Sequence, residues 1–206
     1  MSKGVIFDMD GVLVESEEFY YQRRIRFFEE KGIVPGSDNL LDHVGKTDRG
    51  IWEMLIPHDS HLRQALHEEY KTYREAHPID YPDALRKEVP EVLGALKEQN
   101  IKVGLASSSA RKEINQMLSA TGLAPAFDYV LSGEELKESK PNPEIYLKTA
   151  SALGCADYLA VEDSVLGIRS AKAAGLYTVA LKQSYPVDQS EADIVITDLR
   201  TLLNMI

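Results

Sequence analysis

The sequence of 206 residues contains a single cysteine, Cys155, and no long apolar run. One thiol cannot form an internal disulfide, so the fold does not depend on an oxidising compartment. The apolar segment near the N-terminus stops at Asp8 and is too short for a signal peptide or a membrane span. We therefore expect a cytoplasmic protein with no membrane partner, and a monomer is the simplest assembly.

Positive charge is also scarce, because 23 Lys and Arg residues stand against 33 Asp and Glu residues, for a formal net charge of −10. Proteins that bind nucleic acids hold the phosphate backbone with clusters of Lys and Arg, so this composition argues against a nucleic-acid partner. A small anionic ligand remains compatible with it, since a local site can be positive on a negative surface. The sequence has no internal repeat and no low-complexity segment.

Strand and helix patterns alternate through most of the chain. Short β-branched or aromatic runs predict strands at residues 5–7, 101–106, 129–131, 158–161, 178–181 and 193–196. Between them, helices are predicted at residues 92–99, 111–120, 143–153 and 165–174, several of them followed by a glycine that can cap the helix. This alternation predicts an α/β fold with a parallel sheet that is covered by helices on both faces.

A purely helical pattern fills the segment between the first strand and residue 80. Residues 16–31 form one predicted helix, whose apolar side is Phe19, Ile25, Phe27 and Phe28, and two or three more helical patterns follow. The sequence changes character at His77-Pro78 and again at Tyr81-Pro82. We therefore predict a helical insert at residues 15–79 with a hinge at each end, and a core made of residues 1–14 and 80–206.

Polar side chains stand where the predicted strands end. These candidate residues are Asp8 and Asp10 after the first strand, Ser107 after the second, Lys140 before a helix, and Glu162 and Asp163 after a later strand. Because the carboxyl ends of parallel strands share one edge of the sheet, we expect these residues to meet in one crevice.

The chemistry of such a set points to phosphoryl transfer. Carboxylates at one edge form a hard-oxygen site that suits Mg²⁺. A carboxylate can also attack phosphorus to form an aspartyl phosphate. A metal, a lysine and a hydroxyl would hold the transferring phosphoryl oxygens. A second aspartate could protonate the leaving oxygen and later accept a proton from water.

Four segments resemble the motifs of the haloacid dehalogenase superfamily, in the same order and with similar spacing. They are Asp8–Leu13, Ala106–Ser109, Lys140–Pro143 and Glu162–Ile168, and the resemblance extends from about residue 4 to residue 182. It implies a Rossmann-like core with a helical cap inserted after the first motif. The pattern is most similar to β-phosphoglucomutase and to the sugar-phosphate phosphatases that share this cap.

The resemblance also implies a role for each motif residue. Asp8 would be the nucleophile and a ligand of Mg²⁺, and Asp10 would be the acid and base, with its backbone carbonyl on the metal. Asp163 would complete the metal site with support from Glu162. The implied phosphate-binding residues are Ser107, Ser108 and Lys140. True dehalogenases lack an aspartate at the position of Asp10, so its presence favours phosphate chemistry.

We expect the cap to select the substrate. The candidate residues for substrate contact are Tyr20, Arg24, Lys46 and Arg49, and for any single one of them a solvated surface position is the alternative. The predicted function is a Mg²⁺-dependent phosphatase that hydrolyses a small phosphorylated metabolite, foremost a sugar phosphate, through an aspartyl phosphate. The alternatives are a phosphosugar mutase and a non-catalytic binding module on the same fold.

Tyr20 bears on the choice between phosphatase and mutase. β-Phosphoglucomutase resembles this chain through the first motif, but it carries a histidine on the first cap helix that helps to couple substrate binding to the acid/base aspartate. Counted from Asp10, the matching residue is Tyr20. Tyrosine has a reference pKa of about 10, against about 6.5 for histidine, and is a poor proton relay near neutral pH. The sequence therefore favours the phosphatase.

Overall fold

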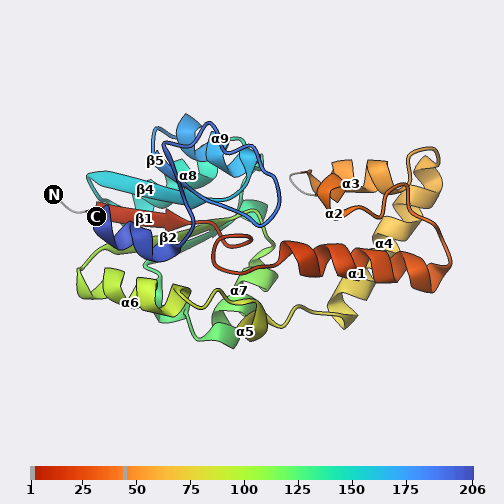
Figure 1. The fold of residues 1–206 in the computed structure, drawn as a ribbon, viewed down its shortest axis with the longest axis horizontal. Helices are drawn as coiled ribbons and strands as arrows, with labels where there is room; N and C mark the ends of the chain where they lie inside the picture. The colour runs from red at the N-terminus through yellow and green to blue at the C-terminus, as the bar shows by residue number, and fades with distance from the viewer. Residues whose placement is uncertain (1–2, 44–45) are drawn as a thin grey trace. The chain divides into compact units, whose positions relative to one another are not determined.

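The computed structural model describes residues 3–43 and 46–206, and the chain divides into two compact units (Figure 1). The first unit, called the core below, contains Met1–Glu15 and Tyr81–Ile206. The second, called the helical unit, contains Ser16–Asp80. Each unit buries a hydrophobic cluster of its own.

The core is built on a parallel sheet of six strands in the order β3–β2–β1–β4–β5–β6. The strands are β1 (Lys3–Phe7), β2 (Lys102–Ser107), β3 (Tyr129–Ser132), β4 (Asp157–Glu162), β5 (Tyr177–Leu181) and β6 (Ile194–Ile196). The chain builds the sheet outwards from β1 to β3 and then returns to the other side of β1 to add β4. In open sheets of this kind, ligands bind at the carboxyl ends of the strands where the order reverses, which here is between β1 and β4.

Helices cover both faces of this sheet (Figure 1). They are α5 (Tyr81–Ala84), α6 (Val89–Glu98), α7 (Arg111–Thr121), α8 (Glu144–Leu153) and α9 (Val165–Ala173), with 3₁₀ turns η1 (Ala124–Ala126), η2 (Gly133–Glu135) and η3 (Leu199–Asn204). The predicted α/β fold with a parallel sheet is confirmed. The prediction missed α5 and the 3₁₀ turns, because segments this short show no apolar periodicity.

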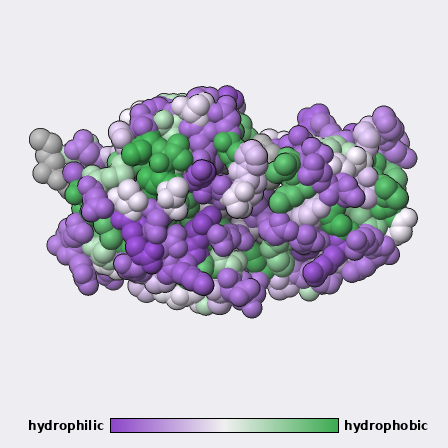
Figure 2. Space-filling model, in the orientation of Figure 1, coloured by the Kyte–Doolittle hydropathy of each residue, from purple (hydrophilic) through white to green (hydrophobic). Residues whose placement is uncertain are grey.

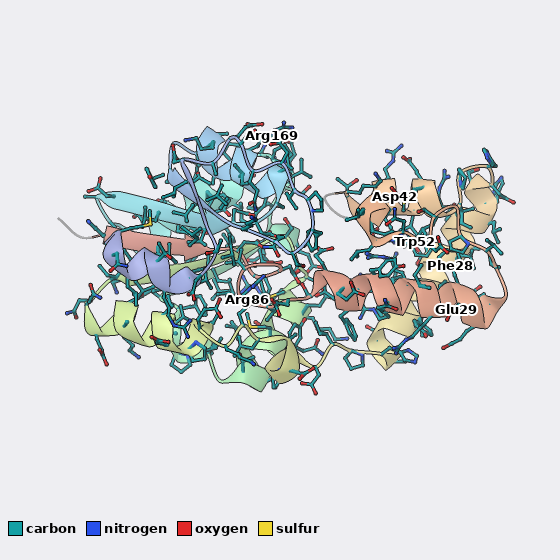
Figure 3. The ribbon with its side chains drawn as sticks, in the orientation of Figure 1. Phe28, Glu29, Asp42, Trp52, Arg86 and Arg169 are labelled. Atoms are coloured by element: carbon teal, nitrogen blue, oxygen red, sulfur yellow. The ribbon has the colours of Figure 1, made fainter. Side chains whose placement is uncertain are left out.

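The helical unit consists of α1 (Glu17–Lys31), α2 (Leu40–His43), α3 (Asp48–Leu55) and α4 (Ser60–Ala76). The side chains of Thr47 and Asp59 cap the first turns of α3 and α4. Among the buried residues of this unit, Phe28 lies against Trp52 with ring centroids 5.9 Å apart (Figure 3). The unit thus has an aromatic core that is independent of the sheet.

The predicted apolar side of the first helix is only partly correct. Phe27 and Phe28 are buried, but Phe19 and Ile25 are half-buried, and Arg23 and Arg24 occupy buried positions of α1 instead. Arg23 is accommodated because its guanidinium lies 5.2 Å from the ring centroid of Phe19 and donates through Nε to the Tyr70 hydroxyl.

The surface is mainly hydrophilic on the face shown in Figure 2, in keeping with the high content of charged residues. Ile194 and Val195 of the edge strand β6 are among the exposed large apolar side chains. No helix in the described part of the chain is both long and apolar enough to cross a membrane.

Candidate active site

The loop after β1 brings two aspartates to the carboxyl edge of the sheet. The backbone N–H of Asp8 donates to the carbonyl of Val161 at 2.9 Å, which ties the loop to β4. Gly11 follows with a left-handed φ of 76°. A Cβ on Gly11 would lie 2.1 Å from Oδ2 of Asp163, so only glycine lets this turn approach the acidic loop after β4.

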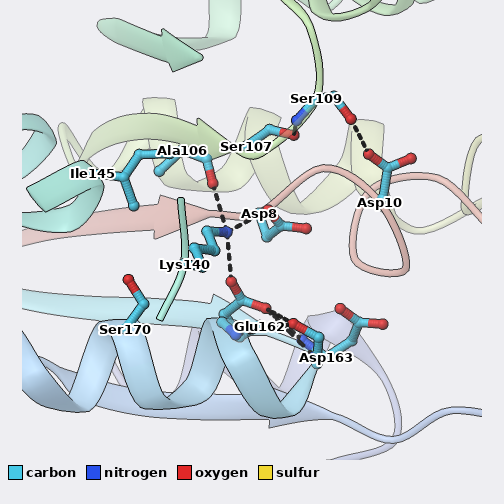
Figure 4. Close-up of polar contacts among 12 residues, drawn as sticks. Asp8, Asp10, Ala106, Ser107, Ser109, Lys140, Ile145, Glu162, Asp163 and Ser170 are labelled. Carbon is cyan, nitrogen blue, oxygen red and sulfur yellow. Dashed lines mark hydrogen bonds and ion pairs between the residues drawn. The ribbon is translucent and has the colours of Figure 1, made fainter. Parts of the chain in front are cut away.

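Lys140 lies between the acidic side chains (Figure 4). Its Nζ donates to Oδ1 of Asp8 at 2.6 Å, to Oε1 of Glu162 at 2.6 Å and to the carbonyl of Ala106 at 3.0 Å. Only 6% of the side chain is exposed, so the ammonium charge is buried. Three acceptors match its three protons, which is the condition under which a charge can be buried without a large penalty.

Glu162 is fully buried and is held by hydrogen bonds at both carboxylate oxygens. In addition to Lys140, Oε1 accepts from the Tyr146 hydroxyl at 2.7 Å. Oε2 accepts from the backbone N–H of Asp163 at 3.1 Å and from Oγ of Ser164 at 3.2 Å. Glu162 is therefore placed to orient Lys140.

Asp10 lies on the other side of the site, beside the loop after β2 (Figure 4). Oγ of Ser109 donates to Oδ2 of Asp10 at 2.5 Å, and the N–H of Ser109 donates to Oγ of Ser107 at 3.1 Å. Ser107 is buried at the end of β2, whereas Ser108 is exposed. The two serines predicted to bind phosphate thus differ in surroundings, and Ser109 contacts Asp10.

Three carboxylates form a group that could hold a metal ion. Asp8, Glu162 and Asp163 each offer an oxygen, and these oxygens lie within 4.8 Å of one another. Because both oxygens of Glu162 accept hydrogen bonds, Asp8 and Asp163 are the side chains that could ligate the ion directly. Carboxylate oxygens in excess over one lysine fit a hard divalent cation such as Mg²⁺.

Burial controls the protonation of the site. It raises the pKa of Asp8 to about 7, against the opposing effect of Lys140, while Glu162 and Asp10 raise that pKa further. Burial alone would lower the pKa of Lys140, but the carboxylates of Asp8 and Glu162 outweigh it and raise that pKa. Without a metal, Asp8 therefore takes up a proton near neutral pH while Lys140 stays charged. A bound divalent cation would favour the ionised form of Asp8.

The four residues predicted to contact substrate all lie in the helical unit. Arg49 is 86% exposed and its Nε donates to Glu53 at 2.8 Å. Lys46 is exposed, and Tyr20 is half-buried beneath the guanidinium of Arg23. Arg24 differs from these three, because it is buried and its Nε has no hydrogen-bond partner among the described residues.

Several residues that complete the site were not among the predicted ones. Tyr146 and Ser109 contact Glu162 and Asp10 directly. Gly167 lies behind Glu162, and a Cβ there would be 1.9 Å from Oε1 of Glu162. Ser109 belongs to a quoted motif and could have been chosen from it, whereas nothing in the sequence marks Tyr146 as more than an inward-facing residue of a helix.

Comparison with known proteins gives consistent similarities. The sequence model of a family described as haloacid dehalogenase-like hydrolase matches residues 5–181. A phosphorylated carbohydrates phosphatase of Thermotoga maritima is 32% identical over 185 residues, which cover 84% of this chain and 82% of that protein. A β-phosphoglucomutase of Bacillus subtilis is 28% identical over 205 residues, which cover 94% of this chain and 88% of that protein.

A solved structure shows the same fold. The crystal structure of a HAD phosphatase from Thermococcus onnurineus matches with a TM-score of 0.70 at 24% identity, over 98% of this chain and 97% of the other. At this level of identity the likeness concerns the arrangement of the strands and helices alone.

Proposed function

Because this chain belongs to the haloacid dehalogenase-like hydrolases, we propose that it is a Mg²⁺-dependent phosphatase that acts on a small phosphorylated metabolite, foremost a sugar phosphate. The observation that carries the proposal is the buried Asp8–Lys140–Glu162 arrangement, in which Lys140 holds Oδ1 of Asp8. A carboxylate that is oriented through one oxygen can attack phosphorus with the other.

In the proposed reaction, Oδ2 of Asp8 forms a bond to phosphorus as the bond from phosphorus to the ester oxygen breaks. Asp10 gives its proton to the leaving oxygen. Water then attacks the aspartyl phosphate and gives a proton to Asp10, and inorganic phosphate leaves as Asp8 is regenerated. Lys140 compensates the negative charge beside the nucleophile, and Ser107 and Ser108 are the proposed phosphate-binding hydroxyls.

The proposed Mg²⁺ ligands are the carboxylates of Asp8 and Asp163 and the backbone carbonyl of Asp10, with Glu162 as support. When bound there, Mg²⁺ would neutralise charge on the transferring phosphoryl group. The carboxylates of Asp8 and Asp163 would bind the ion, and Glu162 keeps Lys140 close to Asp8.

We assign substrate selection to the helical unit, as the cap that the resemblance implies. Of the candidates Tyr20, Arg24, Lys46 and Arg49, Arg24 has the most support, because a buried guanidinium Nε without a hydrogen-bond partner is costly unless a ligand supplies one. A phosphorylated polyol would offer both anionic and hydroxyl oxygens to such a group. Arg49 and Lys46 are exposed and have less support.

The second candidate is a phosphosugar mutase, in which a sugar phosphate rather than water takes the phosphoryl group from Asp8. The similarity to a β-phosphoglucomutase favours it. Tyr20 argues against it, since this residue stands where the mutase carries its relay histidine. A non-catalytic module is disfavoured, because Asp8, Asp10, Lys140 and Asp163 are all present.

One assay separates these candidates. Phosphorylated sugars and nucleotides, including β-glucose 1-phosphate with and without glucose 1,6-bisphosphate, are incubated with the enzyme and Mg²⁺, and free phosphate and glucose 6-phosphate are followed. We expect phosphate release from sugar monophosphates without the bisphosphate, and loss of activity with a chelator. Asp8→Asn should abolish turnover with unchanged circular dichroism, because an amide cannot attack phosphorus. Rapid isomerisation with little phosphate release would establish the mutase instead.

A further inference from the structure

Arg86 lies outside all four motifs, on the segment where the chain re-enters the core after α5. Its side chain is 15% exposed, and its Nη2 donates to the carbonyl of Gly11 at 3.1 Å and to Oε1 of Gln183 at 3.2 Å. Nη1 pairs with Glu15 at 2.9 Å. Nε is buried and has no partner in the described residues. The terminal nitrogens thus connect the turn after Asp10, the loop after β5 and the end of the first core segment.

The carbonyl of Gly11 is held from two directions. Nε2 of Gln183 donates to it at 2.9 Å and also donates to the carbonyl of Leu181, at the end of β5, at 3.1 Å. The Cα of Gly11 faces the carboxylate of Asp163, as the contact of 2.1 Å for an added Cβ shows. The Asp10–Gly11 turn is therefore confined between Asp163 and the pair formed by Arg86 and Gln183.

The backbone of Arg86 is itself anchored beside this turn. Its N–H donates to the carbonyl of Leu13 at 3.0 Å, and the N–H of Glu15 donates to the carbonyl of Ala84 at 2.8 Å. These bonds flank an isolated antiparallel bridge between Val14 and Leu85, which pairs the outgoing and returning segments of the core. A guanidinium that extends from a fixed backbone can set the position of the carbonyl to which it donates.

We propose that Arg86 and Gln183 are positioning residues that hold the Asp10–Gly11 turn, and so set where Asp10 stands relative to Asp8. The inference rests on the proposed function, since it concerns the acid and base of that reaction. A guanidinium is suited to the task because its planar fork reaches two acceptors at once, which an ammonium group at the same place would not do with the same geometry. Displacement of a catalytic group by about 1 Å costs on the order of a hundredfold in rate.

The kinetic test compares Arg86→Gln, Arg86→Lys and Gln183→Leu with the wild type. We expect each variant to lower kcat by about tenfold or more with little change in KM, because the turn is misplaced while the substrate-binding groups remain. Arg86→Lys should not restore kcat, although it keeps the charge. The Arg86→Gln/Gln183→Leu double variant should be no slower than the slower single variant, since both residues act through one carbonyl. Multiplied effects, or full rescue by lysine, would overturn the proposal.

Arg169→Gln is the matched control. Arg169 forms an ion pair with Glu191 at 2.7 Å, with both side chains half exposed, and it lies on α9 away from Arg86 (Figure 3). This variant loses an arginine–carboxylate contact without touching the turn, so kcat should stay within about twofold of wild type. A loss as large as that of Arg86→Gln would show that the effect is a general one and would overturn the assignment.

Hydrogen exchange gives a second measurement that needs no catalysis. The backbone N–H groups of Gly11, Leu13 and Val14 are hydrogen-bonded within the turn. In Arg86→Gln these amides should exchange at least tenfold faster, with no change in Arg169→Gln. Unchanged exchange would refute the positioning role. If the wild type hydrolysed no phosphate ester, the proposed function would fail, and faster exchange in Arg86→Gln would still establish the contact with the turn.

Discussion

Asp8 and Lys140 determine the charge state of this site. Burial raises the pKa of Asp8 to about 7, although Lys140 lies 2.6 Å away. The reactive form of a nucleophilic carboxylate is the ionised one. The site therefore depends on additional positive charge to keep Asp8 ionised, and a divalent cation beside Asp8 and Asp163 would supply it.

Binding of Mg²⁺ should release a proton from Asp8 in slightly acidic solution. Below its raised pKa of about 7, Asp8 is protonated in the metal-free protein, and the ion displaces that proton. Titration calorimetry in buffers of different ionisation enthalpy should give nearly one proton per Mg²⁺ at about pH 6 and almost none at about pH 9. The Mg²⁺ affinity should rise with pH up to about 7 and then level off. A pH-independent affinity over this range would contradict the raised pKa.

Tyr146→Phe should weaken the site without removing any of the motif residues. The variant loses the hydroxyl that donates to Oε1 of Glu162 at 2.7 Å, a buried hydrogen bond to a carboxylate. We expect a loss of about 1.5–3 kcal/mol in the free energy of unfolding, measured with urea. We also expect a lower kcat, since Glu162 orients Lys140. Tyr177→Phe, at an exposed position of β5, is the control and should change stability by less than about 0.5 kcal/mol.

The first turn of α9 shows how one helix serves the site. Ser164 caps it by accepting a hydrogen bond from the N–H of Gly167 at 3.0 Å, and its Oγ also donates to Oε2 of Glu162 at 3.2 Å. The absence of a side chain at Gly167 leaves room for the Glu162 carboxylate. The start of α9 thus caps the helix through Ser164, lets the Glu162 carboxylate approach closely at Gly167, and orients that carboxylate.

Two helical glycines should respond in opposite ways to alanine. A Cβ at Gly167 would lie 1.9 Å from Oε1 of Glu162, so Gly167→Ala must displace the carboxylate and should cost about 1–3 kcal/mol, with a loss of kcat. Gly94 in α6 has no atom within 4 Å of an added Cβ, so Gly94→Ala should stabilise the protein by about 0.5–1 kcal/mol. Urea unfolding of both variants measures this. If both variants changed the free energy of unfolding by the same amount, the Glu162 carboxylate would be able to move aside at little cost.

Each of the two units that the structure describes buries a hydrophobic cluster. Phe27, Trp52, Leu55 and Tyr70 belong to the cluster of the helical unit, whereas Ile6 and Tyr146 belong to the cluster of the core. Trp52 is the single tryptophan of the chain, so its fluorescence reports on the helical unit alone. Unfolding of a protein with two such clusters need not be two-state.

Cavities in the two units should therefore affect different signals. Leu55→Ala removes a buried side chain of the helical unit and should cost about 2–5 kcal/mol, lowering the urea midpoint of Trp52 fluorescence more than that of circular dichroism. Leu105→Ala, at a buried position of β2, is the matched variant and should shift circular dichroism more. If both signals moved together in both variants, the two units would unfold as one.

The sequence by itself determined the succession of strands and helices along the chain and the residues that stand at the strand ends. Asp8, Ser107 and Glu162 each end or follow a short β-branched run, and parallel strands place such positions at one edge whatever the details of packing. The α/β fold follows from the same alternation. These properties are local, because they depend on the period of apolar residues and on the turn that follows each strand.

Only the tertiary structure decided the contacts that orient these residues. Tyr146 reaches Glu162 from α8, and Gln183 reaches Gly11 across 172 residues of sequence. Arg24 carries a charge, which favours an exposed position, yet it is buried in α1. The physical reason is that a side chain's direction and its hydrogen-bond partner depend on which elements pack together, and no local pattern encodes that pairing.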